Sequence, residues 1–385
     1  MQLLNGCAIL IVMKKPTKKQ TLIGGIALGL VAVITTATVL MIVFLCDNDD
    51  NKGRTPGFNQ TAIEFAGNIR VGWNLGNSLD AHRTWGAGNL DGRTQADMER
   101  YWGNPPITRE QIQTVRDAGF NAIRIPVTWR HFTGPGPYYV IEDVLMRRVR
   151  HVVDYAIGLD MYVKINIHHD DHTHGWLFAT PEARDGALLR LGRLWTQIAT
   201  EFRNYDERLI FEGMNEVRTA PGSFTSGTPE NRAIINQFNQ RFVDTVRATG
   251  GNNRYRFLVV KTHAGFHTDS AFDGFILPQD DRLIVSVHIY SVNPASIRHS
   301  LRRMNRDFVQ NGVPIFIGEW GTQANANVNR VEHADMFMSY ATQYGATAFW
   351  WDNGSTGANT YRLLNRETLA WVFPDIVAAI MDNVF

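Results

Sequence analysis

Two glutamates lie at the ends of short apolar runs, where a buried charge would be costly unless it were paired or took part in chemistry. Glu216 closes the run that begins at Phe211, and Glu319 closes the run that begins at Pro314. Burying a carboxylate is costly unless it is paired or used, and two facing carboxyl groups can divide the roles of proton donor and nucleophile. Either glutamate alone would more often be a solvated surface charge. The two are therefore predicted to be a catalytic pair, provided that the fold brings them together.

Further polar and aromatic side chains occupy equivalent places at the ends of other apolar runs. Arg124 lies inside such a run, where a guanidinium needs an anionic partner, and Glu319 is the candidate. Asn215 directly precedes Glu216. The other residues predicted to contact a substrate are Asn74, Asn77, His168, His169, His288, Tyr290, Trp320 and Trp350.

The histidine-rich run from His168 to His172, with His174 beyond it, also allows a metal site, because histidine and aspartate ligate zinc and di-metal centres. Successive strand residues point to opposite faces, so His168 and His169 cannot both point inward unless the strand ends between them. The favoured interpretation has one histidine bonded to a substrate while the others shape the loop. No metal and no cofactor are predicted, and the roles of His172 and His174 stay open.

The balance of charge favours an uncharged partner. The 385 residues carry 38 Lys and Arg against 37 Asp and Glu, and a net charge of +1 creates no field that attracts a polyanion, so nucleic acid is disfavoured. The 10 Trp, 11 Tyr and 21 Phe supply rings for core packing or for stacking. Cys7 and Cys46 are the only cysteines, which excludes cysteine catalysis and Cys-ligated zinc after residue 46.

Eight short β-rich runs alternate with helical patterns, as is typical of repeated βα units and a parallel sheet. Eight is the strand number of a (β/α)8 barrel, which places its active site at the C-terminal ends of the strands. A doubly wound open sheet is the alternative, although no dinucleotide or P-loop motif follows the first run. The predicted strands are Ile69–Leu75, Phe120–Ile125, Met161–Ile167, Leu209–Met214, Phe257–Lys261, Leu283–Val287, Pro314–Gly318 and Thr347–Trp351.

Helix starts between these runs are marked by their capping residues. Thr108 with Gln111 has the spacing of a capping box. Thr180-Pro181 and Thr228-Pro229 each open a longer segment whose apolar residues recur at three- and four-residue intervals. The alternation of strand and helix is therefore regular.

The N-terminal segment has the pattern of a membrane or signal helix. Residues 21–45 carry no charge and are mainly apolar, so they are long enough to cross a hydrocarbon core of roughly 30 Å. Lysines before the segment and aspartates after it place residues 1–20 in the cytoplasm and the rest outside, either anchored or secreted. An uncleaved anchor is favoured, because cleaved signals have a shorter apolar region. Residues 46–57 are predicted to be a polar linker and 58–385 the catalytic domain, and Met13 competes with Met1 as the translation start.

From residue 58 to the C-terminus the sequence resembles glycoside hydrolase family 5, most closely its subfamily 4 of endoglucanases and xyloglucanases. Any one of the matching motifs is weak evidence, but eight in the right order are strong. They are Gly72–Ala81, Trp102–Pro105, Arg124–Trp129, Asn166–His169, Phe211–Glu216, Val287–Tyr290, Ile317–Gly321 and Phe349–Gly354.

The resemblance implies a role for each residue of the candidate site. Glu216 would be the general acid and base, Glu319 the nucleophile, and Asn215 the partner of the sugar 2-hydroxyl. Arg124 and Tyr290 would position the nucleophile. His168 and His288 would line the subsite of the cleaved bond, with Trp350 stacked under the sugar. Two departures put the shape of the subsites in question, since Asp170 stands where the family has Glu and Val217 where it has Pro.

The predicted function is that of a retaining endo-β-1,4-glucanase, a cellulase-type enzyme that acts as a monomer on β-1,4-glucan. Two alternatives stay open, namely a membrane-tethered glycan-binding protein without turnover and a metal-dependent barrel hydrolase. The presence of both glutamates, with Asn215 and Arg124, disfavours the first. Motifs do not fix the choice among cellulose, xyloglucan, mixed-linkage glucan, xylan and mannan, because loop shapes decide it.

Overall fold

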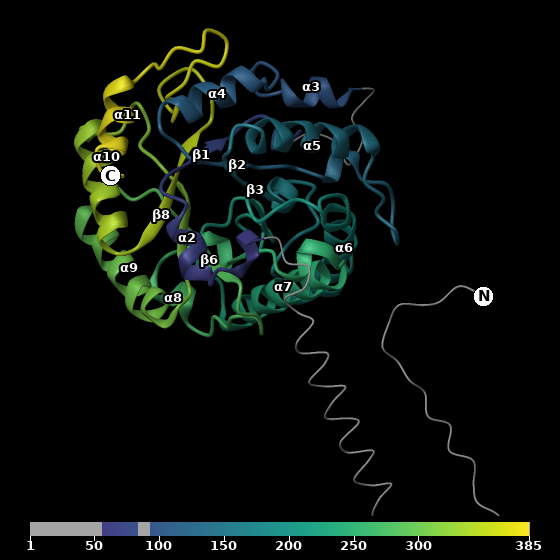
Figure 1. The fold of residues 1–385 in the computed structure, drawn as a ribbon. Helices are drawn as coiled ribbons and strands as arrows, with labels where there is room; N and C mark the ends of the chain where they lie inside the picture. The colour runs from purple at the N-terminus through teal and green to yellow at the C-terminus, as the bar shows by residue number, and fades with distance from the viewer. Residues whose placement is uncertain (1–55, 84–92, 385) are drawn as a thin grey trace, which may run out of the picture. The chain divides into compact units, whose positions relative to one another are not determined.

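The computed structural model describes residues 56–83 and 93–384, which fold around a closed barrel of eight parallel strands in chain order (Figure 1). Each strand pairs with the next, and β8 closes the barrel on β1. The (β/α)8 prediction is confirmed, and the open-sheet alternative is wrong. The strands are β1 Gly72–Leu75, β2 Ala122–Ile125, β3 Tyr162–Asn166, β4 Leu209–Glu212, β5 Leu258–Lys261, β6 Leu283–Ile289, β7 Ile315–Trp320 and β8 Ala346–Asp352.

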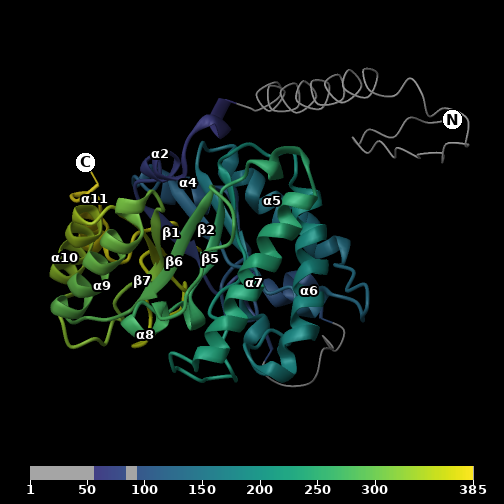
Figure 2. The same cartoon turned by 90° about the horizontal axis from the view of Figure 1, so that it is seen from below.

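Helices surround the barrel and cover the outer faces of its strands (Figures 1 and 2). The predicted capping box of Thr108 and Gln111 is present, and Thr180 and Thr228 cap the two longest helices. A threonine side chain that accepts an orphan backbone N–H fixes where a helix starts. The helices are α2 Ala62–Gly67, α3 Gln95–Glu99, α4 Arg109–Asp117, α5 Asp143–Ile157, α6 Pro181–Glu201, α7 Pro229–Ala248, α8 Asp269–Phe272, α9 Pro294–Asp307, α10 Arg330–Gln343 and α11 Pro374–Met381.

The barrel belongs to a compact unit that spans Thr55–Phe385, close to the predicted 58–385. The predicted cytoplasmic segment 1–20, the membrane or signal helix 21–45 and most of the linker 46–57 lie outside the described residues. Among the helices of the described part, none is both long and apolar enough to cross a bilayer.

An apolar plug closes one end of the barrel, where α2 lies (Figure 2). Phe65 of α2 stacks on Phe257 with ring centroids 3.8 Å apart and meets Tyr162 edge-on at 5.6 Å. Phe316 and Phe349 complete this end from inside β7 and β8. Because rings fill this end of the interior, any chemistry must take place at the other end, where the strands finish.

Above the plug the interior of the barrel becomes polar. Strand side chains alternate between the interior and the surrounding helices, so a residue two positions after an inward one also points inward. Ala122, Ile210 and Val259 belong to the plug, and each is followed two positions later by a charged residue. The charged side chains of this layer are buried, and they are Arg124, Lys164, Glu212 and Lys261.

Candidate active site

Glu216 and Glu319 meet at the C-terminal end of the barrel, one just after β4 and one near the end of β7. A carboxylate oxygen of each and a ring nitrogen of His288 lie within 4.8 Å of one another. His288 Nδ1 is 2.7 Å from Glu216 Oε1 and 3.5 Å from Glu319 Oε2. Two carboxyl groups this close leave no room for an intervening water, which is the spacing at which one of them attacks a sugar directly.

Two donors hold the Glu319 carboxylate in one orientation. Arg124 Nη1 lies 2.6 Å from Oε1, and the Tyr290 hydroxyl donates to Oε2 at 2.8 Å. Burial, together with the neighbouring Glu319, raises the pKa of Tyr290 well above its ordinary value, so the phenol remains a donor. The predicted pairing of Arg124 with Glu319 is confirmed, and Tyr290 reaches the same carboxylate.

A β-bulge in β7 aims Glu319 into the barrel. Ile317 pairs with Val287 of β6, but the next residue of β6, His288, pairs with Glu319 and leaves Gly318 as the extra residue. An extra residue reverses the in-and-out order of the side chains beyond it. Glu319 therefore points inward, as Phe316 does. Gly318 is suited to this place because a Cβ there would lie 2.6 Å from Ser286 Oγ.

Lys261 fixes the tautomer of His288. Lys261 Nζ lies 2.6 Å from His288 Nε2, and an ammonium can only donate, so Nε2 is the acceptor. The ring proton then sits on Nδ1 and is donated to Glu216. Burial lowers the pKa of His288 well below its ordinary value, which keeps the ring neutral. His288 thus acts as a fixed neutral donor to the Glu216 carboxylate.

Glu212 is a buried counter-ion beneath the catalytic pair. Arg124 Nε donates to it at 2.6 Å, and Lys261 and Lys164 lie 3.4 Å and 3.6 Å from its other oxygen. Burial alone would raise the pKa of Glu212, but Arg124 and the two lysines outweigh burial and hold it well below its ordinary value. Glu212 therefore stays ionised and balances the cations of the interior.

Sequence reasoning missed Glu212, Lys164 and Lys261, although a signal was present. Each is a lone charged residue within a strand-like apolar run, the same pattern that singled out Arg124. Strand parity places all three inside the barrel once the register is known.

Arg218 is a further cation that sequence reasoning missed. Its Nη2 bonds the Glu216 carboxylate, and its guanidinium lies 4.4 Å from the ring centroid of Phe224. Arg218 follows Val217, the position at which the family usually has Pro, and Val217 itself is buried in the core. The side chain at this departure from the family is therefore part of the core and not of the cleft surface.

Asn215 and Asn74 both accept a hydrogen bond from Arg124, but their amide nitrogens differ in the hydrogen bonds that they make. Asn215 Oδ1 accepts from Arg124 Nη2 at 2.8 Å, and no hydrogen bond of its amide nitrogen is found within the described residues, which leaves that nitrogen available to a sugar hydroxyl. Asn74 accepts from Arg124 at 3.0 Å and donates to three backbone carbonyls. Because Asn74 is fully buried and saturated, its predicted contact with substrate is corrected to a positioning role.

The other predicted contacts separate into two groups. His168 lies beside the pair, with Nε2 3.9 Å from Glu319 Oε1. Asn77 lies at the rim, where its amide donates to Ser355 at 3.3 Å. The strand stops at Asn166 and a 3-10 turn, His169–Asp171, follows it, so His169 does not continue the strand alternation. His169 lies with His82 and His172 instead.

The structure corrects the predictions for Trp320 and Trp350. Both indoles are fully buried, so neither can stack on a sugar. Beyond the bulge Trp320 faces the helices and stacks on Phe337 of α10 at 4.2 Å, and Trp350 packs against Trp320 and donates to the Tyr361 carbonyl. Trp351, one residue on, points to the opposite side and lies parallel to the His168 ring at 5.7 Å.

A barrel that holds two carboxyl groups at this spacing at the C-terminal ends of its strands has the arrangement of a two-carboxylate glycoside hydrolase. Comparison with known families matches residues 80–357 to cellulase (glycosyl hydrolase family 5). The chain belongs to glycoside hydrolase family 5.

Individual relatives are similar over most of the chain. Cellulase/esterase CelE of Acetivibrio thermocellus is 40% identical over 345 residues, which cover 83% of this chain and 40% of that protein. Endoglucanase B of Clostridium cellulovorans is 37% identical over 83% of this chain and 75% of its own length. Among solved structures, a GH5-4 broad specificity endoglucanase from Ruminococcus champanellensis with bound cellotriose has a TM-score of 0.77 and 38% identity, covering 84% of this chain and 98% of its own. The chain spans less than half the length of CelE.

Proposed function

We propose that this chain is a retaining endo-β-1,4-glucanase that cleaves internal bonds of cellulose-type glucans. The observation that carries the proposal is the separation of the two carboxylates, whose nearest oxygens lie within 4.8 Å. Retaining enzymes need this short spacing, whereas inverting ones need about 6.5–9.5 Å for a water molecule.

We propose one step of the reaction for each group. Glu319, held by Arg124 and Tyr290, attacks the anomeric carbon, while Glu216 gives its proton to the oxygen of the departing chain. The C–O bond to that chain breaks as the bond to Glu319 forms. Glu216 then removes a proton from water, which attacks the same carbon and releases Glu319. The amide nitrogen of Asn215 is available to the 2-hydroxyl throughout both steps.

The glycan preference is proposed from the named relatives. Solved structures similar to this chain include a family 5 xyloglucanase from Paenibacillus pabuli and a glycoside hydrolase 5 lichenase from Caldicellulosiruptor sp. F32, at 32% and 35% identity. We expect hydrolysis of carboxymethylcellulose, mixed-linkage glucan and xyloglucan. Product profiles on these three polymers, with xylan and mannan beside them, measure the preference.

Proton NMR of the first-formed product tests the proposal. Cleavage of a β-glucan should release the β-anomer first, and an initial α-anomer would mean inversion. Glu319→Gln should abolish formation of the covalent intermediate. Glu216→Ala should slow that step least for substrates with good leaving groups, because they need little acid help.

The inactive glycan-binding alternative is disfavoured by the completeness of the site, since a binding protein has no need of two carboxylates this close together. The membrane tether of residues 21–45, export of the catalytic domain and action as a monomer stay predictions from the sequence. Full-length protein should partition with membranes, while a chain that starts at Asn51 should be soluble and active.

A further inference from the structure

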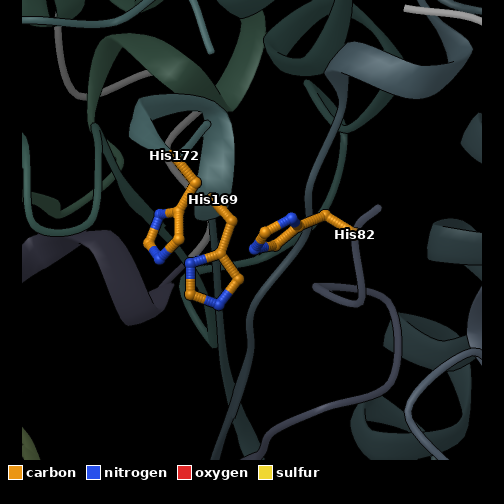
Figure 3. A group of neighbouring side chains, drawn as sticks. All are labelled: His82, His169 and His172. Carbon is orange, nitrogen blue, oxygen red and sulfur yellow. The ribbon is translucent and has the colours of Figure 1, made fainter. Parts of the chain in front are cut away.

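Three histidines from two loops converge beside the catalytic cleft. His82 follows β1, and His169 and His172 follow β3. One ring nitrogen of each lies within 4.8 Å of the other two. The His169 ring stands between the other two, with centroids 4.9 Å from His82 and 4.2 Å from His172 (Figure 3). The sequence offered His169 and His172 as a candidate metal run but gave no reason to include His82.

The outer nitrogens of His172 and His169 face carboxylates, and that of His82 lies between a carbonyl and a guanidinium. His172 Nδ1 lies 3.0 Å from Asp171 Oδ1. His82 Nδ1 lies 3.3 Å from the Arg83 carbonyl and 3.1 Å from Arg130 Nη2, so a metal on Nε2 requires the Nδ1 proton to face the carbonyl and Arg130 to give up this contact. His169 Nε2 lies 3.7 Å from Asp80 Oδ2. Metal-bound histidines almost always direct their second nitrogen to a carboxylate or carbonyl in this way, which fixes the tautomer and the ring orientation.

The inner nitrogens have no such partner within the described part of the chain. His169 Nδ1 is buried and makes no hydrogen bond there. In Figure 3 the Nε2 atoms of His82 and His172 point toward the His169 ring from either side. With the ring protons on the outer nitrogens, the three inner nitrogens would direct their lone pairs toward one point, where a cation could bind.

We propose that His82, His169 and His172 form a binding site for a transition-metal dication such as Zn²⁺, through His82 Nε2, His169 Nδ1 and His172 Nε2. Imidazole nitrogens bind zinc at about 2.0–2.1 Å, and three of them leave a fourth position for water or another ligand. Cysteine is absent from the set, which favours Zn²⁺, Co²⁺, Ni²⁺ and Cu²⁺ over softer ions.

Two buried carboxylates adjoin the three histidines, together with one guanidinium, that of Arg130, which contacts His82. Asp80 and Asp171 are buried, and Asp171 Oδ2 has no hydrogen-bond partner in the described residues. By contrast, the group of Glu216, His288 and Glu319 is already surrounded by Arg124, Arg218 and Lys261. A dication would meet those three cations, so the catalytic pair is unsuited to a metal.

The site adjoins the reaction centre but does not share its residues. His169 contacts His168 with ring centroids 4.3 Å apart, and His168 in turn lies 3.9 Å from Glu319 Oε1. A bound metal would link the loop after β1 to the loop after β3. We therefore expect metal binding to raise the melting temperature without being required for hydrolysis.

Titration of full-length, untagged protein with Co²⁺ after exhaustive chelation tests the site. Three-histidine coordination should give visible d–d bands that saturate at one equivalent, and Zn²⁺ should abolish them by competition. His82→Ala and His172→Gln should each weaken binding at least tenfold. His172 is partly exposed, so its variant keeps the test valid if His82→Ala fails to fold.

His174→Asn is the matched control, because His174 is exposed, lies outside the three-histidine group and has a positive φ that asparagine tolerates. It should bind Co²⁺ as the parent does. Absence of one-equivalent binding, or binding that survives both His82→Ala and His172→Gln, would overturn the proposal.

Discussion

Replacing Arg124 by lysine measures how far the reaction depends on one guanidinium. Arg124 donates to Glu212 and Glu319 at 2.6 Å, to Asn215 at 2.8 Å and to Asn74 at 3.0 Å. Lysine keeps the charge but carries it on one nitrogen, which cannot reproduce a planar fork. Losing the bonds to Glu319 and Asn215, at about 1.5–3 kcal/mol each, removes about 3–6 kcal/mol. Since about 1.4 kcal/mol is tenfold, kcat/KM should fall by about 10²–10⁴.

Steady-state kinetics on a cello-oligosaccharide and on an aryl cellobioside with a good leaving group give the comparison. Arg124 contacts the nucleophile and Asn215 and not the proton donor. The loss of kcat/KM in Arg124→Lys should therefore be similar for both substrates. The control Glu216→Gln lacks the proton donor. Its loss of kcat/KM should be smaller on the aryl substrate, because a good leaving group needs little protonation. Urea denaturation of each variant shows whether the protein is folded at the assay temperature.

Two outcomes would refute this reasoning about Arg124. A folded Arg124→Lys protein whose kcat/KM stays within tenfold of the parent would mean that Tyr290 and His288 suffice to hold Glu319. If Arg124→Lys loses kcat/KM on the cello-oligosaccharide but not on the aryl substrate, Arg124 would act through acid catalysis and not through the nucleophile.

Three further predictions follow from the same interior. Burial lowers the pKa of Lys164 from 10.5 to about 7, so above pH 7 the unfolded chain holds a proton that the folded chain has lost, and stability rises with pH toward 10.5. Lys164→Met should therefore be more stable than the parent at pH 6, by at most about 5 kcal/mol, with a smaller difference at pH 9 in urea denaturation. Trp351→Ala should raise KM several-fold, whereas Trp350→Phe should leave KM unchanged and cost about 1 kcal/mol of stability through its lost hydrogen bond. Exhaustive chelation should leave turnover intact, and a loss restored by zinc would contradict the two-carboxylate mechanism.

The sequence was sufficient for the barrel because its signals are local. Each strand is a short apolar run, and caps such as Thr108 mark the helices between them. The rule that active sites lie at the C-terminal ends of barrel strands then brings Glu216 and Glu319 together without any knowledge of their side-chain contacts. Charge balance predicts an anionic partner for Arg124, since a guanidinium within a strand requires an anion, but it does not show that Glu212 and Glu319 share that guanidinium.

The directions in which individual side chains point depend on the register between neighbouring strands, which no local sequence pattern reveals. The extra residue at Gly318 decides that Glu319 points inward while Trp320 and, beside it, Trp350 point toward the helices. A choice between adjacent tryptophans therefore could not be made from composition or motif. His82 is separated from His169 by two strands of sequence, and only the closed barrel brings their loops together.

The buried charges link both catalytic carboxylates to one residue that does not react. Arg124 joins Glu212 to Glu319, and Lys261 joins Glu212 to His288, which donates to Glu216. When Glu319 becomes an ester it loses its negative charge, but the cations remain. The site then carries surplus positive charge where the carboxylate must re-form, and this favours departure of Glu319 in the second step. Glu212 offsets part of that surplus and keeps Arg124 ionised inside the barrel, and the positive charge that remains favours hydrolysis of the intermediate.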